Sequence, residues 1–320
     1  MNAVSSFAVS GVGLLTPPAD APAGGWFDYK RELGPRGYKY LPSASQYMLA
    51  ATRRALTDSG ADLAGVEPEA RGAAIGTNCA ASALHGDMDR TVLATGAGDL
   101  SPALAPYFSI NLFGSRLAME HELKGFNLTF TSPRIAGLEA MQYGLRSVRL
   151  GRASWLVAGA AEESLDQVEP GADGSEAGAV AVVLEPEDTV TRRAEGRCYG
   201  RCQAWTGFLP PSQAGPERAG PDRAAGLVAM ARRAFGLPAD ARPQVRAVLD
   251  DSPVGAAISR ALGLDARGSD ADGLAAGAGC LRPMLELARA LTDPPGDSPD
   301  GRLVVTAAAE GNVAFALVTR

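Results

Sequence analysis

Apolar residues recur along this chain in two alternating patterns, short β-rich runs and longer segments with helical spacing. Phe7–Leu15 is a nearly continuous apolar run, which predicts a buried strand. Ser43 or Ser45 is expected to cap a helix that runs to about Ser59, with apolar side chains at helical spacing, and Gly60 is of a residue type that commonly ends a helix. Strand and helix patterns keep alternating to the last residues, and this order favours parallel sheets covered by helices.

The remaining elements follow the same alternation, with Pro/Gly-rich loops between several of them. Strands are expected at 72–79, 127–132, 154–161, 179–185, 196–205 and 245–250, helices at 135–150, 223–235, 253–262 and 280–291, and a strand pair across 302–319. The order of elements is similar in the two halves, 1–190 and 191–320. We therefore expect a structural repeat whose halves form one compact unit.

The segment from Asn127 to Glu163 reads as strand, tight corner, helix and strand. Pro133 and Arg134 form the corner. Such a corner presents one side chain at a helix N-terminus, where backbone N–H groups stabilise an anion and where enzymes often carry a nucleophile. Arg134 occupies that place, and a guanidinium stays protonated and cannot attack a substrate. The corner is therefore predicted to lack a reacting group.

Pro102–Leu123 is a further helical candidate with an unusual number of large apolar side chains. They are Tyr107, Phe108, Ile110, Leu112, Phe113, Leu117 and Met119. Because these residues are too many for one stripe, we expect a helix that is buried on more than one face, as happens at the contact with a partner.

Composition narrows the possible functions. The chain has 320 residues, a hydrophobic fraction of 46% and a charged fraction of 21%, which is typical of a globular protein with a large core. Its net charge is −6 and it has no basic run, which argues against nucleic-acid binding. It has neither a signal peptide pattern nor an apolar run of about 20 residues, so we expect a cytoplasmic protein that does not enter a membrane.

Neither a metal nor a cofactor is expected. Cys198 and Cys202 have a C-x₃-C spacing, but no second ligand pair follows, and zinc needs four ligands. Gly11 and Gly13 follow a strand, yet Thr16 stands where a dinucleotide-binding loop has its third glycine. The spacing therefore gives only a weak indication of a nucleotide site.

Four short motifs, taken together, carry a resemblance to a known family. They are VSGVGLLTP at 9–17, GAAIGT at 72–77, SPRIAGL at 132–138 and DGSEAGAVAVVLE at 173–185. With this order and spacing, nearly the whole chain resembles the β-ketoacyl synthases of the thiolase superfamily. The resemblance implies an α/β, thiolase-like fold in which two mixed sheets stack with helices in α-β-α-β-α layers. The loops around 96–104 and 210–226 are shortened relative to that family.

The resemblance also implies that the catalytic residues of the family are degenerate in this chain. The family's cysteine falls on Arg134, its lysine on Ser269, and its two histidines on Val248 and Leu274. The two histidines of the chain, His85 and His121, both lie in the first half, so no shift of the alignment restores a Cys-His-His site. We expect no catalytic residue of the chain's own, and whether it forms part of an enzyme depends on a partner.

Within the family, the chain resembles the chain-length factors, which are inactive partners of ketosynthases in type II polyketide synthases. This resemblance implies a heterodimer with an active ketosynthase, joined through the strand near 127–132 and the helix before it. The partner would catalyse decarboxylative condensation on acyl-carrier-protein substrates, while this chain would shape the acyl tunnel and limit chain length. The residues expected at the tunnel or interface are Phe108, Leu112, Phe113, Met119 and Arg134. The short loops favour a polyene-type, reducing system.

Several alternatives stay open at the same positions. Arg134 is expected chiefly to fill the vacated pocket, but it would also suit a carrier phosphate, a carboxylate ligand, or a pair with Glu162 or Glu163. A second class of function is malonyl decarboxylation with Arg134 holding the carboxylate, and a third is a scaffold without a tunnel. Cys79 and Cys280 are alternative nucleophiles, although buried cysteines mostly pack as small hydrophobic residues.

Overall fold

The computed structural model describes residues 7–18, 25–165, 172–193, 197–215, 222–264, 277–294 and 298–320. They contain one mixed sheet with the strand order β3-β2-β4-β5-β1-β6-β9-β8-β7. The strands are β1 (Phe7–Leu15), β2 (Arg71–Gly76), β3 (Phe126–Phe130), β4 (Trp155–Glu162), β5 (Gly178–Pro186), β6 (Gly200–Phe208), β7 (Gln244–Val248), β8 (Arg302–Ala307) and β9 (Asn312–Thr319). The expected alternation of strands and helices is confirmed.

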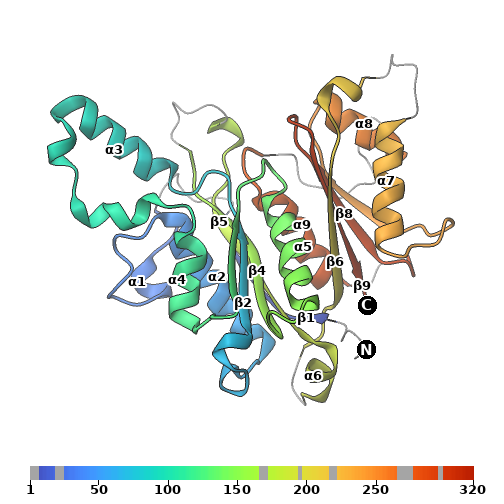
Figure 1. Ribbon diagram of the computed structural model, residues 1–320, viewed down its shortest axis with the longest axis horizontal. Coiled ribbons are helices and arrows are strands. Elements are labelled where there is room, and N and C mark those ends of the chain that lie inside the picture. Colours follow the sequence, from blue (N-terminus) through green and yellow to red (C-terminus); the bar gives the residue numbers. More distant parts are fainter. Residues whose placement is uncertain are drawn as a thin grey trace.

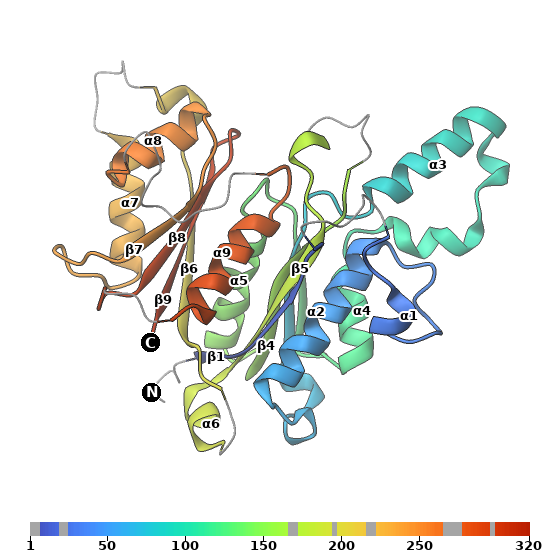
Figure 2. The same cartoon turned by 180° about the vertical axis from the view of Figure 1, so that it is seen from behind.

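The sheet consists of two halves that meet at one short junction. β1 pairs with β5 along its length, but with β6 only through Ala8 opposite Arg201 and Val9 opposite Gly200. Beyond this junction the halves diverge, and helices α5 (Ala136–Arg149) and α9 (Leu281–Thr292) lie between them (Figures 1 and 2). Both helices have strongly one-sided apolar patterns and contribute to the buried cluster that joins the two halves.

Other helices cover the outer faces. Helix α2 (Ser43–Ser59) packs on the first half, and α7 (Arg223–Ala234) and α8 (Pro253–Ala261) pack on the second (Figure 2). From one outer face to the other, the layers are a helix, the first half of the sheet, the central helices, the second half of the sheet and further helices. This layering confirms the thiolase-like fold. Helix α2 ends where the sequence predicts, because Gly60 takes the left-handed conformation that ends it, with φ of 59°. Its N-cap is Pro42, so the expected cap at Ser43 or Ser45 is wrong.

The two halves repeat one strand arrangement. The order β2-β4-β5-β1 in the first half corresponds to β7-β8-β9-β6 in the second. In each half the central helix, α5 or α9, precedes the second strand of that series. A counterpart of β3 would precede α9, where residues 265–276 lie outside the described part of the chain.

The single helix expected at Pro102–Leu123 is wrong. The segment forms a 3₁₀-helix, η4 (Pro102–Phe108), and a separate helix, α4 (Leu112–His121). Ser109 between them is extended, with φ of −88° and ψ of 127°, and Pro106 has no backbone N–H to continue an α-helix. Together with α3 (Ser82–Thr95), η4 projects from the body of the molecule (Figure 1).

The remaining elements are short. They are α1 (Tyr29–Glu32), α6 (Glu187–Arg192) and the 3₁₀-helices η1 (Leu63–Gly65), η2 (Pro68–Ala70), η3 (Ala97–Asp99), η5 (Ala172–Gly174) and η6 (Pro211–Gln213). None of the helices in the described ranges is long and apolar enough to cross a membrane.

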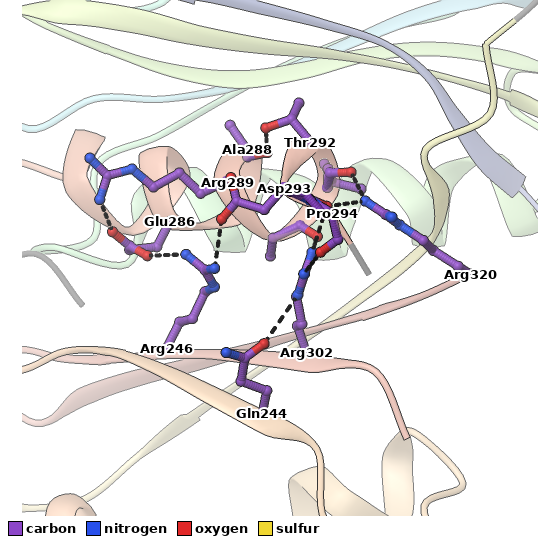
Figure 3. A network of polar contacts seen from close by, with 12 residues as sticks. Gln244, Arg246, Glu286, Ala288, Arg289, Thr292, Asp293, Pro294, Arg302 and Arg320 are labelled. Atoms are coloured by element: carbon purple, nitrogen blue, oxygen red, sulfur yellow. Dashed lines mark hydrogen bonds and ion pairs between the residues drawn. The ribbon is translucent and has the colours of Figure 1, made fainter. Parts of the chain in front are cut away.

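A polar network holds the last turn of α9 (Figure 3). Arg302 of β8 donates to the backbone oxygens of Ala290 at 2.8 Å and Asp293 at 3.1 Å, and also to that of Pro294. Arg246 of β7 pairs with the fully buried Glu286 at 3.3 Å. The Arg302 guanidinium satisfies carbonyls that a helix end leaves without partners, and Arg246 pairs with a carboxylate of the same helix, so α9 is fixed to the second half of the sheet.

Candidate functional site at the corner before helix α5

The expected corner is present at the predicted residues. Strand β3 ends at Phe130, helix α5 begins at Ala136, and Pro133 and Arg134 lie in the turn between them. Arg134 has φ of 61°, in the left-handed region that a side chain with a Cβ occupies only at a cost of about 1–2 kcal/mol. The backbone therefore has the strained form that presents a side chain at the start of a helix.

Asn78 holds this corner in place. Its carboxamide oxygen accepts the Arg134 N–H at 3.0 Å, and its Nδ2 donates to the backbone oxygens of Thr131 at 2.9 Å and Ser132 at 3.1 Å. Asn78 follows strand β2, which lies parallel to β3, so the ends of both strands meet at the same edge. Nothing in the sequence indicated this role, because Asn78 falls inside the strand expected at 72–79, whereas β2 ends at Gly76.

The Arg134 side chain crosses from the first half of the molecule to the second. Its Nη1 donates to Asp250 Oδ2 at 2.6 Å and to the backbone oxygen of Ala307 at 2.7 Å. Asp250 follows β7, and Ala307 ends β8. The pairing with Glu162 or Glu163 considered from the sequence is therefore wrong, because both glutamates are engaged elsewhere.

The pair is half-shielded from water, with 16% of the Arg134 side chain and 25% of the Asp250 side chain exposed. Burial alone would raise the pKa of Asp250, but hydrogen bonds from Ser252 and Arg134 outweigh it, so the pKa lies below its usual value. Asp250 therefore stays ionised opposite the guanidinium at neutral pH.

Glu162 organises the floor beneath the corner. It is fully buried and accepts the backbone N–H groups of Asn78 at 2.8 Å, Cys79 at 2.7 Å and Cys280 at 2.8 Å. Because Asn78 and Cys79 belong to the first half and Cys280 to the start of α9, one carboxylate connects the two halves. These donors explain why Glu162 is not available to Arg134.

Two more buried glutamates lie at helix starts. Glu163 accepts the backbone N–H of Ala83 at 3.1 Å, and Glu176 accepts those of Leu281 at 2.7 Å and Arg282 at 3.3 Å. Burial raises the pKa of Glu163, and it raises the pKa of Glu176 to about 7. Glu176 therefore changes its protonation near neutral pH, whereas the N–H donors favour its charged form.

The cysteines give no activated nucleophile. Burial, with the charge of Glu162 adding to it, raises the pKa of Cys79 to about 12 and that of Cys280 well above its usual value. Cys202 is buried while Cys198 is exposed and precedes β6, so they do not share a strand. No group of three or more metal-ligating side chains occurs in the described ranges.

The first glycine pair of the chain has a packing role. A Cβ on Gly11 or Gly13 would collide with the backbone oxygens of Ala55 and Ala51, so helix α2 lies directly against β1 at these positions. This close approach explains the G-x-G spacing without a nucleotide.

Of the other three positions expected to be degenerate, only Val248 belongs to the described residues. Val248 is fully buried at the end of β7, two residues before Asp250, and its backbone oxygen accepts the Thr306 hydroxyl at 2.8 Å. Ser269 and Leu274 lie outside the described residues. The corner therefore brings Arg134 close to the strand end that carries Val248.

The four apolar residues expected at a tunnel wall do not gather in one place. Phe113 is 1% exposed and belongs to the core beneath α2, and Leu112 is partly buried. Phe108 is 62% exposed and Met119 is 71% exposed. Phe108 lies against His85, with ring centroids 5.0 Å apart. The division of Pro102–Leu123 separates Phe108 in η4 from the other three residues, which all belong to α4 but differ in burial.

A family model for "Beta-ketoacyl synthase, N-terminal domain" matches residues 27–202, which include the corner and Glu162. The chain belongs to the β-ketoacyl synthase family. The family model covers more than half of the chain, and the thiolase-like layers described above agree with it.

Curated relatives match a shorter stretch of this β-ketoacyl synthase homologue. Over 141 residues the chain is 28% identical to "Granaticin polyketide putative beta-ketoacyl synthase 1" of Streptomyces violaceoruber. This stretch covers 42% of the chain and 33% of that relative. The chain is 25% identical over 138 residues to "3-oxoacyl-[acyl-carrier-protein] synthase 2" of Vibrio cholerae serotype O1, covering 43% and 33%. The matched stretch thus spans about a third of each relative.

Solved structures share the fold over nearly the whole chain. "The ishigamide ketosynthase/chain length factor" has a TM-score of 0.74 at 20% identity and is covered over 100% of its chain, with 98% of this one. A chain of the structure "AntDE:AntF (apo): type II PKS acyl-carrier protein in complex with its ketosynthase bound to the hexaketide" has a TM-score of 0.73 at 15% identity, with 99% of this chain and 100% of that one covered. At these identities the likeness establishes the fold.

Proposed function

We propose that this chain is a non-catalytic, chain-length-factor-like subunit of a ketosynthase heterodimer in type II polyketide biosynthesis. The observation that carries the proposal is the ion pair of Arg134 with Asp250 at the strained corner. In the family resemblance, this corner holds the nucleophilic cysteine. Here its side chain is a guanidinium that is already engaged on the opposite half of the molecule.

The chemistry of the available side chains supports the proposal that this chain does not catalyse condensation by itself. A guanidinium is neither a nucleophile nor a general base, because it stays protonated. The thiols of Cys79 and Cys280 have raised pKa values and remain protonated at neutral pH. No histidine follows His121 in the sequence. We therefore propose that the degenerate positions Arg134, Val248, Ser269 and Leu274 leave catalysis to a partner.

The proposed partner is an active ketosynthase, which would receive the acyl chain from an acyl carrier protein. Strand β3 is an edge strand whose backbone pairs with β2 alone among the described strands, so its other side offers N–H and C=O groups to a second chain. Phe108 and Met119 are exposed large apolar side chains on the segments just before β3. A partner that covers this region would bury them.

In this proposal, Phe108, Leu112, Phe113 and Met119 limit the product length from the side of this chain. A wall of large apolar side chains resists a longer acyl chain because overpacking costs about 1–3 kcal/mol. The polyene-type, reducing system and the cytoplasmic location are further parts of the proposal, and they rest on the resemblance and on the composition. The two halves, 1–190 and 191–320, are proposed to act as one unit.

Co-expression with the ketosynthase encoded beside this chain tests the proposal, with size-exclusion chromatography and mass detection as the readout. We expect a one-to-one complex that elongates malonyl-carrier substrates, while neither chain does so alone, and we expect the isolated chain to aggregate or to be unstable. A stable homodimer or monomer that ignores the neighbouring synthase would contradict the heterodimer.

Product length then tests the wall. In the complex, Phe108→Ala should give products longer by at least one extension unit, whereas Leu93→Ala, an 87% exposed residue on α3, should leave the length unchanged. Phe113→Ala is expected to lengthen products as well, but it also removes a core side chain and needs a stability control. Unchanged products from both phenylalanine variants would favour the scaffold alternative.

Malonyl decarboxylation by the chain alone is the second candidate, and the ion pair argues against it. The Nη1 atom that would hold a malonyl carboxylate already donates to Asp250 and Ala307. Release of carbon dioxide by the purified chain, abolished in Arg134→Ala, would reverse this preference.

A further inference from the structure

A small pocket lies far along α5 from the corner, between this helix, strand β6 and the end of α7. It has a volume of about 190 Å³. It opens where β6 leaves the junction with β1, because β6 residues after Arg201 pair with β9 alone among the described strands. Helix α5 therefore faces an unpaired strand edge, and side chains fill the gap only in part.

Two buried amide oxygens point to a missing hydrogen-bond partner in this pocket. Gln142 of α5 and Gln203 of β6 both line it, and the Oε1 atom of each is buried without a partner among the described residues. An unsatisfied buried acceptor destabilises the folded state, so two of them lining one pocket indicate a place for a hydrogen-bond donor. A ligand with an N–H or O–H group would satisfy them.

The rim of the pocket carries positive charge. Arg146 and Arg149, both exposed, belong to the last turns of α5, and none of the described residues lining the pocket has a carboxylate side chain. Neither guanidinium has an ion pair or a side-chain hydrogen bond within the described part of the chain. In a chain with a net charge of −6, two neighbouring unpaired guanidiniums form a local site for an anion.

The wall of the pocket is apolar and partly aromatic. Leu145, Trp205 and Phe235 contribute to it, and the Trp205 ring also packs on Phe315 at 5.9 Å between centroids. A flat apolar body would lie against these side chains while its charged end faces the arginines. The volume is below the roughly 300 Å³ of a site for drug-sized molecules, which limits the ligand to about ten non-hydrogen atoms.

We propose that this pocket binds a small aromatic carboxylate that carries a hydroxyl group, a hydroxybenzoate-like monoanion. Its carboxylate is held by Arg146 and Arg149, its hydroxyl donates to an amide oxygen of Gln142 or Gln203, and its ring packs on Trp205. The site is separate from the Arg134 corner. The inference does not depend on the proposed function, and its test needs no polyketide product.

Fluorine NMR tests the site, with 3-fluoro-4-hydroxybenzoate as the probe and the full chain, alone or bound to its ketosynthase, as the receptor. We expect saturable binding, and we expect the neutral 3-fluoro-4-hydroxybenzamide to bind at least about tenfold more weakly because it lacks the charge. Absence of saturation up to about 10 mM probe, or equal binding of acid and amide, would overturn the proposal.

Variants then locate the binding. The double variant Arg146→Ala/Arg149→Ala should weaken binding of the probe by about tenfold or more. Arg152→Ala removes the same charge from an exposed residue that does not line the pocket, and it should leave binding unchanged. An equal loss of probe binding in the double variant and in Arg152→Ala would show that only the net charge matters, and it would overturn the proposed site.

The glutamines provide a test of selectivity. Gln142→Leu/Gln203→Leu should reverse the preference between 3-fluoro-4-hydroxybenzoate and 3-fluorobenzoate, because the hydroxyl then loses its acceptors while the apolar wall grows. A merely structural role of the two amides predicts the same loss for both probes, and that result would contradict the proposed contact.

Discussion

Arg134 and Arg302 occupy opposite ends of the two central helices. Arg302 lies at the C-terminal end of α9, where the helix dipole and the unpaired carbonyls favour a cation. Arg134 lies at the N-terminal end of α5, where the dipole disfavours a cation, and its backbone is left-handed. Arg302 therefore stabilises its helix end locally, whereas Arg134 depends on Asp250 from the other half. The difference indicates that the stability of the helix end does not account for an arginine at position 134.

The largest effect is expected at Arg302. Arg302→Met keeps the apolar stem but removes the side-chain donor of the Ala290 and Pro294 carbonyls, while Arg320 still donates to that of Asp293, so the free energy of unfolding should fall by about 3 kcal/mol. Urea denaturation measures this loss. Arg152→Met, on the exposed surface, serves as the control and should change little. A loss below about 1 kcal/mol for Arg302→Met would mean that water replaces the guanidinium.

Glu176, which accepts backbone N–H groups at the start of α9, is expected to make the stability of the protein depend on pH. Its pKa is raised from 4.5 to about 7, so its proton stabilises the folded state, and this contribution is complete below pH 4.5 and is lost as the pH rises through about 7. The free energy of unfolding should therefore decrease over this window. Glu176→Gln should flatten the curve there, as measured by denaturation at a series of pH values. An unchanged slope would assign the dependence to another group.

Substitutions at Arg134 separate strain from pairing. Arg134→Ala removes the ion pair but keeps the left-handed strain, whereas Arg134→Gly removes both. We expect the glycine variant to be more stable than the alanine variant by about 1 kcal/mol, since glycine adopts positive φ readily. Thermal and urea unfolding compare them directly. Equal stability would show that the corner relaxes when the guanidinium is gone.

The smallest effect is expected at Asp250. Its pKa is lowered, so the pair with Arg134 is present above the unfolded pKa of 3.8 and is lost as the pH falls through the lower folded value. Asp250→Asn should remove this acid-side dependence and leave stability above neutral pH only slightly reduced, because the pair is partly exposed. Acid titration of both proteins checks the window, and parallel curves would contradict it.

The sequence was sufficient for the local part of the corner. Pro133, Arg134 and the apolar spacing that follows predict the turn and helix α5 to within one residue at each end. It did not reveal Asp250 or Asn78, which lie 116 and 56 residues from Arg134 along the chain. Asn78 comes close because the parallel strands β2 and β3 end at one edge, and Asp250 comes close because the two halves of the sheet pack on each other. Spacing along the sequence carries no such information.

The expected helix at Pro102–Leu123 was wrong for a related reason. Its apolar residues suggested one buried element, but Phe113 enters the core while Phe108 lies outside it. Helical spacing cannot distinguish an apolar side chain that packs in the core from one that stays exposed for another surface. The extended residue Ser109 separates these two groups.

The two-residue junction between β1 and β6 has a consequence for how the chain folds. Helices α5 and α9 are each covered by strands from both halves, so a fragment that ends near residue 190 would leave one face of α5 in water. Contacts between such distant segments close long loops, which slows folding of large mixed sheets. During synthesis, the first half should therefore wait for α9 and β8 before its interior is complete.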